Sequence, residues 1–217
     1  QAVEKALESP EDFVWSYIAV MFYNNQEQHS LYLTADYSDD KRILAVVENF
    51  EKQFEKQLGK DITKEERLGI KKLVMQTYLR ALALDKCADY GLEALKEFDN
   101  FFIRENTMYA LLKTGRYDEC LKLANEVKDD TNPVPLYYAA ASTLESGEFD
   151  ASAEYVLKLA KQVKTSEYPK IADELLHSYF SLLVVDTETT KAKYSLLSDE
   201  QINKLNSDEF LKNYLEA

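Results

Sequence analysis

The sequence predicts an all-α protein, and three observations support this class. Apolar residues make up 46% and charged residues 30% of the 217 residues, a balance typical of packed amphipathic helices. Only five Gly and four Pro are present, which leaves little for the turns of a barrel or for disordered linkers. No segment shows convincing strand alternation, and the nearest, HSLYLTADY, is too short and isolated to support a sheet. The spacing of apolar residues predicts about 9–11 helices.

Two helices are expected in the N-terminal part of the chain. Ser9 has the character of an N-cap and Pro10 that of a first helical residue, so a helix is predicted over residues 10–23. A second helix begins after Ser38 and stops at Gly59. Its buried stripe is predicted to consist of Ile43, Val46, Val47, Phe50 and Phe54, which follow the spacing of one helix face.

The next two helices are expected between residues 63 and 101. Thr63 and Glu66 have the spacing of a capping box, which predicts a third helix over residues 63–84. A fourth helix follows over about residues 88–101.

Between residues 104 and 185 the helices continue in an alternating pattern of helix, turn with Gly, helix and turn with Pro. Short loops of this kind give antiparallel helix pairs. Residues 186–195 are predicted to form a loop, and SDEQINKL and SDEFLKNYLEA two short capped helices. The organisation expected is residues 1–62 as N-terminal helices, 63–185 as the main array and 186–217 as a C-terminal cap, in one continuous domain.

The net charge is −13, which disfavours nucleic acid as a partner because the chain repels phosphate backbones, and no local basic patch is visible in the sequence. The longest apolar stretch, residues 13–23, is well short of the roughly 20 residues that a membrane-spanning helix needs. We therefore expect no direct membrane insertion and a basic or neutral partner.

No pattern of catalytic residues is recognised. The two histidines, His29 and His177, have no second His or Cys at metal-ligand spacing. No Gly-rich phosphate loop, nucleophile elbow or Cys-His pair is visible. Cys87 and Cys120 lie in helical patterns, which favours two reduced core thiols. The sequence predicts a protein that is not an enzyme and needs no metal or cofactor.

One acidic cluster admits a second interpretation. The segment DYSDD, residues 36–40, is similar to an aspartate-rich metal motif of helical prenyl-transferring enzymes. A matching second motif is missing, and Ser38 followed by two acids is the ordinary start of a helix. Helix capping is therefore favoured over metal binding.

The chain contains an internal repeat with a period of 32 residues. Placing Gly115 under Gly147 aligns KTGRYDEC with ESGEFDAS. Gly permits a tight turn, the following aromatic fills the gap between paired helices, and a small residue lets the helices approach closely. The residues expected to hold this structure are Gly115, Tyr117, Cys120, Gly147, Phe149 and Ala153.

LLKTGRYDEC and LESGEFDAS resemble the tetratricopeptide repeat (TPR) family, most clearly over residues 104–160. The resemblance implies a TPR-like α-solenoid of antiparallel helix pairs with an extended concave surface. An irregular helical bundle with one such pair is the alternative. The family's concave positions, transferred residue by residue, imply a partner-binding face of Glu105, Tyr109, Lys113, Tyr137, Glu145, Asp173 and His177.

The function implied is a protein-protein interaction module: an adaptor, a scaffold or an assembly subunit of a larger complex that binds a protein or peptide. Two other hypotheses stay open, the peptide-sensing half of a bacterial transcription regulator and an all-helical enzyme. The cytoplasm is the favoured location. A membrane-associated or extracytoplasmic location stays open because the chain begins at Gln1 rather than Met.

Overall fold

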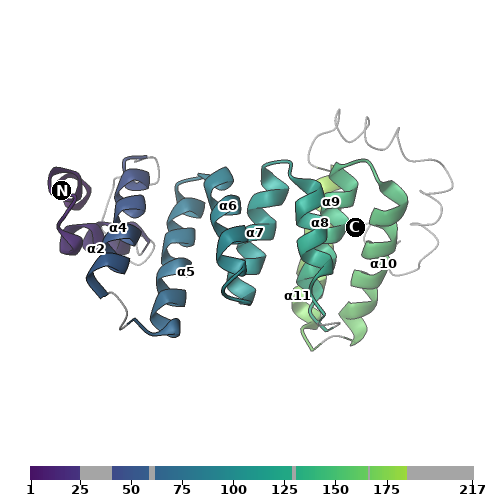
Figure 1. Ribbon diagram of the computed structural model, residues 1–217. Helices are drawn as coiled ribbons and strands as arrows, with labels where there is room; N and C mark the ends of the chain where they lie inside the picture. The colour runs from purple at the N-terminus through teal and green to yellow at the C-terminus, as the bar shows by residue number, and fades with distance from the viewer. Residues whose placement is uncertain (25–40, 59–61, 129–130, 166, 185–217) are drawn as a thin grey trace. The chain divides into compact units, whose positions relative to one another are not determined.

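The computed structural model describes residues 1–24, 41–58, 62–128, 131–165 and 167–184. Over these residues the chain forms ten helices and no strand, which confirms the predicted all-α class (Figure 1). The helices are α1 (Ala2–Glu8), α2 (Phe13–Asn24), α4 (Ile43–Leu58), α5 (Lys64–Arg80), α6 (Leu84–Leu95), α7 (Phe101–Lys113), α8 (Tyr117–Asn125), α9 (Pro133–Glu145), α10 (Phe149–Thr165) and α11 (Pro169–Val184).

The helix predicted over residues 10–23 begins later than expected. Ser9 is not an N-cap; it closes α1, and its backbone N–H donates to the last turn of that helix. The carboxylate of Asp12 accepts a hydrogen bond from the backbone N–H of Val14 at 2.9 Å, so Asp12 satisfies a free N–H group at the start of α2. Helix α1 was not predicted.

The start of α5 was predicted correctly, but its end was not. Thr63 Oγ1 accepts from the Glu66 N–H at 3.1 Å, and Glu66 Oε2 accepts from the Thr63 N–H at 2.8 Å, which completes the capping box. The Thr63 N–H and hydroxyl both donate to the Glu66 carboxylate, and these two hydrogen bonds lower the pKa of Glu66 because they stabilise its charged form. Helix α5 ends at Arg80 rather than continuing to residue 84.

The reason for the early end is a turn at Leu82, which has a left-handed backbone with φ of 53°. No Gly or Pro marks this position, so the apolar run ALAL was predicted as helix. Helix α6 therefore covers Leu84–Leu95 instead of about 88–101, and Phe101 belongs to α7.

Three turns in the chain share one hydrogen-bond pattern. The N–H of the left-handed residue donates to the carbonyl three positions earlier, and the next N–H donates to the carbonyl five positions earlier, as in a Schellman motif. The left-handed residues are Leu82, Gly115 and Gly147, spaced by 33 and 32 residues. The donor-acceptor distances are 3.0 and 2.9 Å at Leu82, 3.3 and 2.9 Å at Gly115, and 3.1 and 2.8 Å at Gly147.

The same three segments also match after the turn. Cys87, Cys120 and Ser152 each lie five positions beyond the left-handed residue and are buried. Their backbone N–H groups donate to the carbonyls of the residues four positions earlier, at 2.9, 3.1 and 3.0 Å. We call the stretches α5 to α6, α7 to α8 and α9 to α10 the first, second and third segments.

The chain divides into two compact units, Gln1–Ala110 and Leu111–Ala217. In the first unit α4 contacts α2 and α5, and the predicted stripe of α4 is buried, as expected. Phe50 stacks on Phe13 with 5.5 Å between ring centroids. Glu51 of α4 accepts hydrogen bonds from Lys71 of α5 and Tyr90 of α6, each at 2.6 Å, so polar contacts also join these helices.

In the second unit α9 contacts α8, α10 and α11. The core is formed mainly by α9, α10 and α11, with Val156, Leu159 and Leu176 fully buried. Ser152 Oγ donates to the carbonyl of Ala140 at 2.8 Å and lies 2.7 Å from the hydroxyl of Tyr179, so a buried polar contact joins α9, α10 and α11. Several predictions concern residues that lie outside the described ones. These are the metal-binding interpretation of residues 36–40, His29, the segment HSLYLTADY, the loop over residues 186–195 and both C-terminal helices.

Candidate functional site

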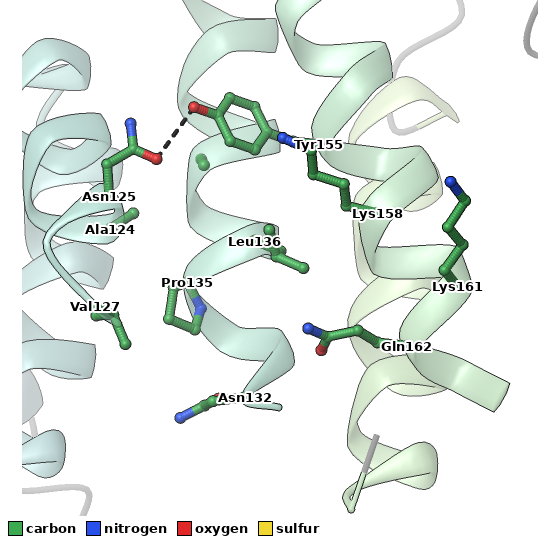
Figure 2. Close-up of a pocket in the computed structure, with 11 residues that line it drawn as sticks. Ala124, Asn125, Val127, Asn132, Pro135, Leu136, Tyr155, Lys158, Lys161 and Gln162 are labelled. Carbon is green, nitrogen blue, oxygen red and sulfur yellow. Dashed lines mark hydrogen bonds between the residues drawn. The ribbon is translucent and has the colours of Figure 1, made fainter. Parts of the chain in front are cut away.

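An open pocket of about 320 Å³ lies in the second unit, between the end of α8, the start of α9 and the middle of α10. Figure 2 shows it in close-up. The residues that line it are Ala124, Asn125, Val127, Asn132, Pro135, Leu136, Ala139, Tyr155, Lys158, Lys161 and Gln162.

The floor of the pocket comes from the first two turns of α9. Asn132 caps this helix: its side-chain oxygen accepts from the backbone N–H of Val134 at 3.0 Å, and Pro133 follows at the first helical position. Pro135 and Ala139 are buried one turn apart, with Leu136 half-buried beside them. The start of α9 thus places apolar residues directly beyond a polar cap.

The walls of the pocket come from α8 and α10. The Tyr155 hydroxyl donates to Asn125 Oδ1 at 3.1 Å and bridges the two helices, as the dashed line in Figure 2 shows. Lys158 Nζ lies 5.3 Å from the centroid of the Tyr155 ring, a cation-π contact. Gln162 is only 9% exposed, and its amide extends toward the start of α9 (Figure 2).

Two lysines, Lys158 and Lys161, are among the described residues that line the pocket. Among the described lining residues there is no Asp or Glu, but Asp129 and Asp130, which lie in the sequence between the lining residues Val127 and Asn132, are outside the described residues. No basic patch was found in the sequence because the two lysines form no run. Only the fold brings the two lysines into one pocket with the side-chain amides of Asn125 and Asn132, which lie elsewhere in the sequence.

The predicted binding residues of α9 do not line this pocket. At 3.6 residues per turn, Tyr137 projects from the side of α9 opposite to Pro135 and Ala139, and Glu145 projects from a flank, roughly 100° away from them. Both are half-buried. Tyr137 packs against the core of the second unit, with its ring edge-on to that of Tyr138 at 5.1 Å.

The other predicted residues of the second unit are on α7 and α11. Lys113 is exposed at the end of α7. Asp173 is half-buried and His177 is exposed; they lie four residues apart on one face of α11, which contacts α9.

Two predicted residues, Glu105 and Tyr109, belong to the part of α7 in the first unit. They lie one turn apart, and Tyr109 is 38% exposed. Burial raises the pKa of the Glu105 carboxyl above its ordinary value of 4.5, because desolvation disfavours the charged form.

The predicted structural residues occupy the turns and the helix contacts near them. Gly115 and Gly147 have φ of +76° and +85°, a region that side chains with a Cβ enter only with strain. Tyr117 and Phe149 begin α8 and α10 and are half-buried, and Ala153 is 5% exposed.

Both thiols are fully buried. Burial raises the pKa of Cys87 to about 12 and that of Cys120 to about 11. Each thiol therefore stays protonated near neutral pH and is a poor nucleophile.

The described part of the chain contains no group of three or more His, Cys, Asp or Glu side chains that could hold a metal ion. Within the same residues, no helix is both long and apolar enough to span a membrane. Comparisons with protein-family models, curated proteins and solved structures found no match to this chain.

Proposed function

We propose that this chain is a protein-protein interaction module built as a TPR-like helical array, in which α7, α9 and α11 contribute to a concave partner-binding face. The observation that carries the proposal is the threefold recurrence of one turn, at Leu82, Gly115 and Gly147, with equivalent hydrogen bonds and spacings of 33 and 32 residues. Helical segments repeated at this period build extended surfaces that suit the binding of other chains.

The turn at Leu82 extends the repeat beyond the two segments that the sequence pattern picked out. Three consecutive segments are the number that repeat proteins generally need, because each segment buries its apolar face against its neighbours. This supports an array over an irregular bundle. The adaptor, scaffold and assembly roles, with a basic or neutral partner and a cytoplasmic location, are part of the same proposal.

The experiment is site-specific photo-crosslinking of the full chain. A benzophenone amino acid replaces Tyr109 or His177, both exposed on the proposed face, and in a control it replaces Lys52, exposed on α4. We expect a protein or peptide adduct at positions 109 and 177 and none at position 52, with a yield that falls as salt is raised.

Tyr137 is left intact in this test because it packs against the core, so that its replacement would confuse lost binding with lost stability. Equal adduct formation at positions 109, 177 and 52 would contradict the proposal. In that case the two alternative hypotheses remain, namely the peptide-sensing half of a bacterial transcription regulator and an all-helical enzyme.

A further inference from the structure

Glu105 on α7 carries a carboxylate that the fold partly buries and does not pair. In the described part of the chain its side chain makes no hydrogen bond and no ion pair, although the residue is half-buried. Burial of a charge without a partner costs free energy, and the raised pKa of Glu105 has this desolvation as its cause. The folded chain therefore keeps a charge that a ligand can compensate.

Two basic side chains near Glu105 have other partners. Arg104, its neighbour in the chain, forms an ion pair with Asp99, with 2.9 Å between Nη2 and Oδ1. Lys72 of α5 lies over the ring of Phe102, with 5.7 Å between Nζ and the ring centroid. Within the described residues neither of these two cations forms an ion pair with Glu105. Both leave the carboxylate without a counter-charge.

Two aromatic rings lie on the same face of α7 as this carboxylate. Phe102 is three residues before Glu105 and Tyr109 is four residues after it, and these spacings place the three side chains in one stripe. The position of Lys72 over Phe102 shows that the stripe accepts an ammonium group on a ring. Tyr109 is 38% exposed and takes part in another contact, so the carboxylate is the main group that the stripe offers to a ligand.

The ligand that complements these groups is a cation. An ionised carboxylate only accepts hydrogen bonds, and the faces of neighbouring rings attract positive charge. A guanidinium group suits a half-buried carboxylate better than an ammonium group does, because it is planar, donates two parallel hydrogen bonds and is less strongly hydrated. The net charge of −13 attracts basic segments of other proteins in the same way.

We propose that Glu105 binds the guanidinium group of an arginine in the partner protein, with the aliphatic part of that arginine against the exposed edge of Tyr109. This rests on the proposed interaction function and names the chemistry that the binding face recognises in the first unit.

The test is an NMR titration of the ¹⁵N-labelled full chain with three capped peptides. They are acetyl-Ala-Leu-Arg-Leu-Ala-amide and two twins that have citrulline or lysine in place of arginine. Citrulline keeps the shape of arginine but carries no charge. We expect shifts at the backbone N–H groups of Glu105, Asn106 and Tyr109, about tenfold weaker binding of the citrulline twin, and intermediate binding of the lysine twin.

Two variants of the chain sharpen this test. Glu105→Gln removes the charge and keeps the size of the side chain, so it should weaken binding of the arginine peptide about tenfold and abolish the preference over citrulline. Because the carboxylate is unpaired, this substitution removes no contact within the fold, and thermal unfolding should show no loss of stability. The control is Glu154→Gln, which makes the same change at an exposed position of α10 and should leave binding as it is.

Several results would overturn the proposal. Equal binding of the arginine and citrulline peptides, or an equal loss of binding in the Glu105 and Glu154 variants, would show that Glu105 is only a solvated carboxylate. Binding of the lysine peptide as tight as that of the arginine peptide would contradict the choice of a guanidinium group. Tighter binding of putrescine at the same residues would assign the site to small free cations. The absence of any shift from every probe counts against it as well.

The closing experiment separates this site from the proposed function. If crosslinking at positions 109 and 177 exceeds that at position 52 but the arginine and citrulline peptides bind equally, the arginine site fails and the interaction module stands. If the arginine peptide is preferred and Glu105→Gln removes the preference while crosslinking is equal at all three positions, the proposed face fails and a local cation site at Glu105 remains.

Discussion

The first and third segments have the same turn geometry, yet their small and large residues are interchanged. The first has Leu82 at the left-handed position and Gly91 in the following helix, whereas the third has Gly147 in the turn and Val156 in the helix. Both turns form the same two backbone hydrogen bonds. The turn is therefore specified by the ends of the two helices, and a glycine there relieves strain without being required.

The two glycines of this comparison serve different physical needs. Gly147 has φ of +85° and open space where a Cβ would lie. Gly91 is helical, but an added Cβ would lie 2.0 Å from Thr107 Oγ1 and 2.7 Å from Met75 Cε. Gly147 is favoured because the backbone there has a positive φ, and Gly91 is favoured because α6 and α7 approach closely.

The largest effect is expected at this close approach. Gly91→Ala should lower the free energy of unfolding by about 2–3 kcal/mol, because the methyl group displaces the buried Thr107, whose hydroxyl donates to the Ile103 carbonyl at 2.6 Å. Denaturant unfolding followed by circular dichroism measures the change.

Gly69→Ala is the matched control, since Gly69 is exposed on α5 and nothing lies within 4 Å of its added Cβ. It should stabilise the protein by up to about 1 kcal/mol through helix propensity. Combining Gly91→Ala with Thr107→Ala, the residue type found at the matching position 139, should recover part of the loss. Equal effects of the two glycine substitutions would contradict the close approach of α6 and α7.

The second effect concerns the buried position five residues after each turn, which is Cys in the first segment and Ser in the third. Ser152→Ala should lower stability by about 1–2 kcal/mol because Tyr179 and the Ala140 carbonyl lose a buried hydrogen-bond partner. A double-mutant cycle with Tyr179→Phe in chemical denaturation measures the coupling. Independent, additive losses would show that the two hydroxyls do not interact.

The third effect is a test of the turn itself. Leu82→Gly should raise stability by about 1 kcal/mol, because Leu82 is 70% exposed, contributes little packing and has φ of 53°. Gly147→Ala should lower stability by a similar amount for the same steric reason. Thermal unfolding of the two single variants decides the matter, and a destabilised Leu82→Gly protein would mean that the leucine side chain makes a contribution that its exposure hides.

The smallest effect is expected at Glu105. This position on the first helix of the second segment corresponds to Lys72 in the first segment and Tyr137 in the third. Burial raises the pKa of Glu105, so the folded protein binds its proton more tightly than the unfolded chain does. The resulting loss of stability is absent below about pH 4.5 and grows as pH rises through the folded pKa.

Glu105→Gln should therefore stabilise the protein at pH 7 by less than about 1 kcal/mol, because the group is partly exposed to solvent, and should change nothing at pH 4. Urea unfolding at the two pH values provides the comparison. A stabilisation of equal size at pH 4 would show that the charge is not the cause.

The comparison also explains which parts of the structure could be predicted. The capping box at Thr63 and the turns at Gly115 and Gly147 have local signals, because the residue type itself favours the observed backbone. Leu82 has no such signal: leucine is a good helix former, and the turn is imposed by the hydrogen bonds around it. Ser9 and Asp12 are both capping residue types, and only the presence of α1 makes Asp12 the one that caps α2.

The pocket could not be predicted for a related reason. Asn125 lies at the end of α8, Asn132 before α9 and Lys158 in the middle of α10, and each alone has the ordinary character of a helix end or a solvated face. Their chemistry depends on contacts between α8, α9 and α10. Transfer of positions from a resembling family indicated another side of α9, since it carries over expected residues and not the local cavity.

The two cysteines allow the local opening of this protein to be measured by thiol modification. Cys87 and Cys120 are the only thiols in the sequence, both are fully buried, and they belong to different units. A thiol reagent added under native conditions modifies each one only after its surroundings open, so the two modification rates report two opening equilibria. Mass spectrometry of the modified peptides, read as a function of time, distinguishes one cooperative transition from two separate ones without any substitution in the chain.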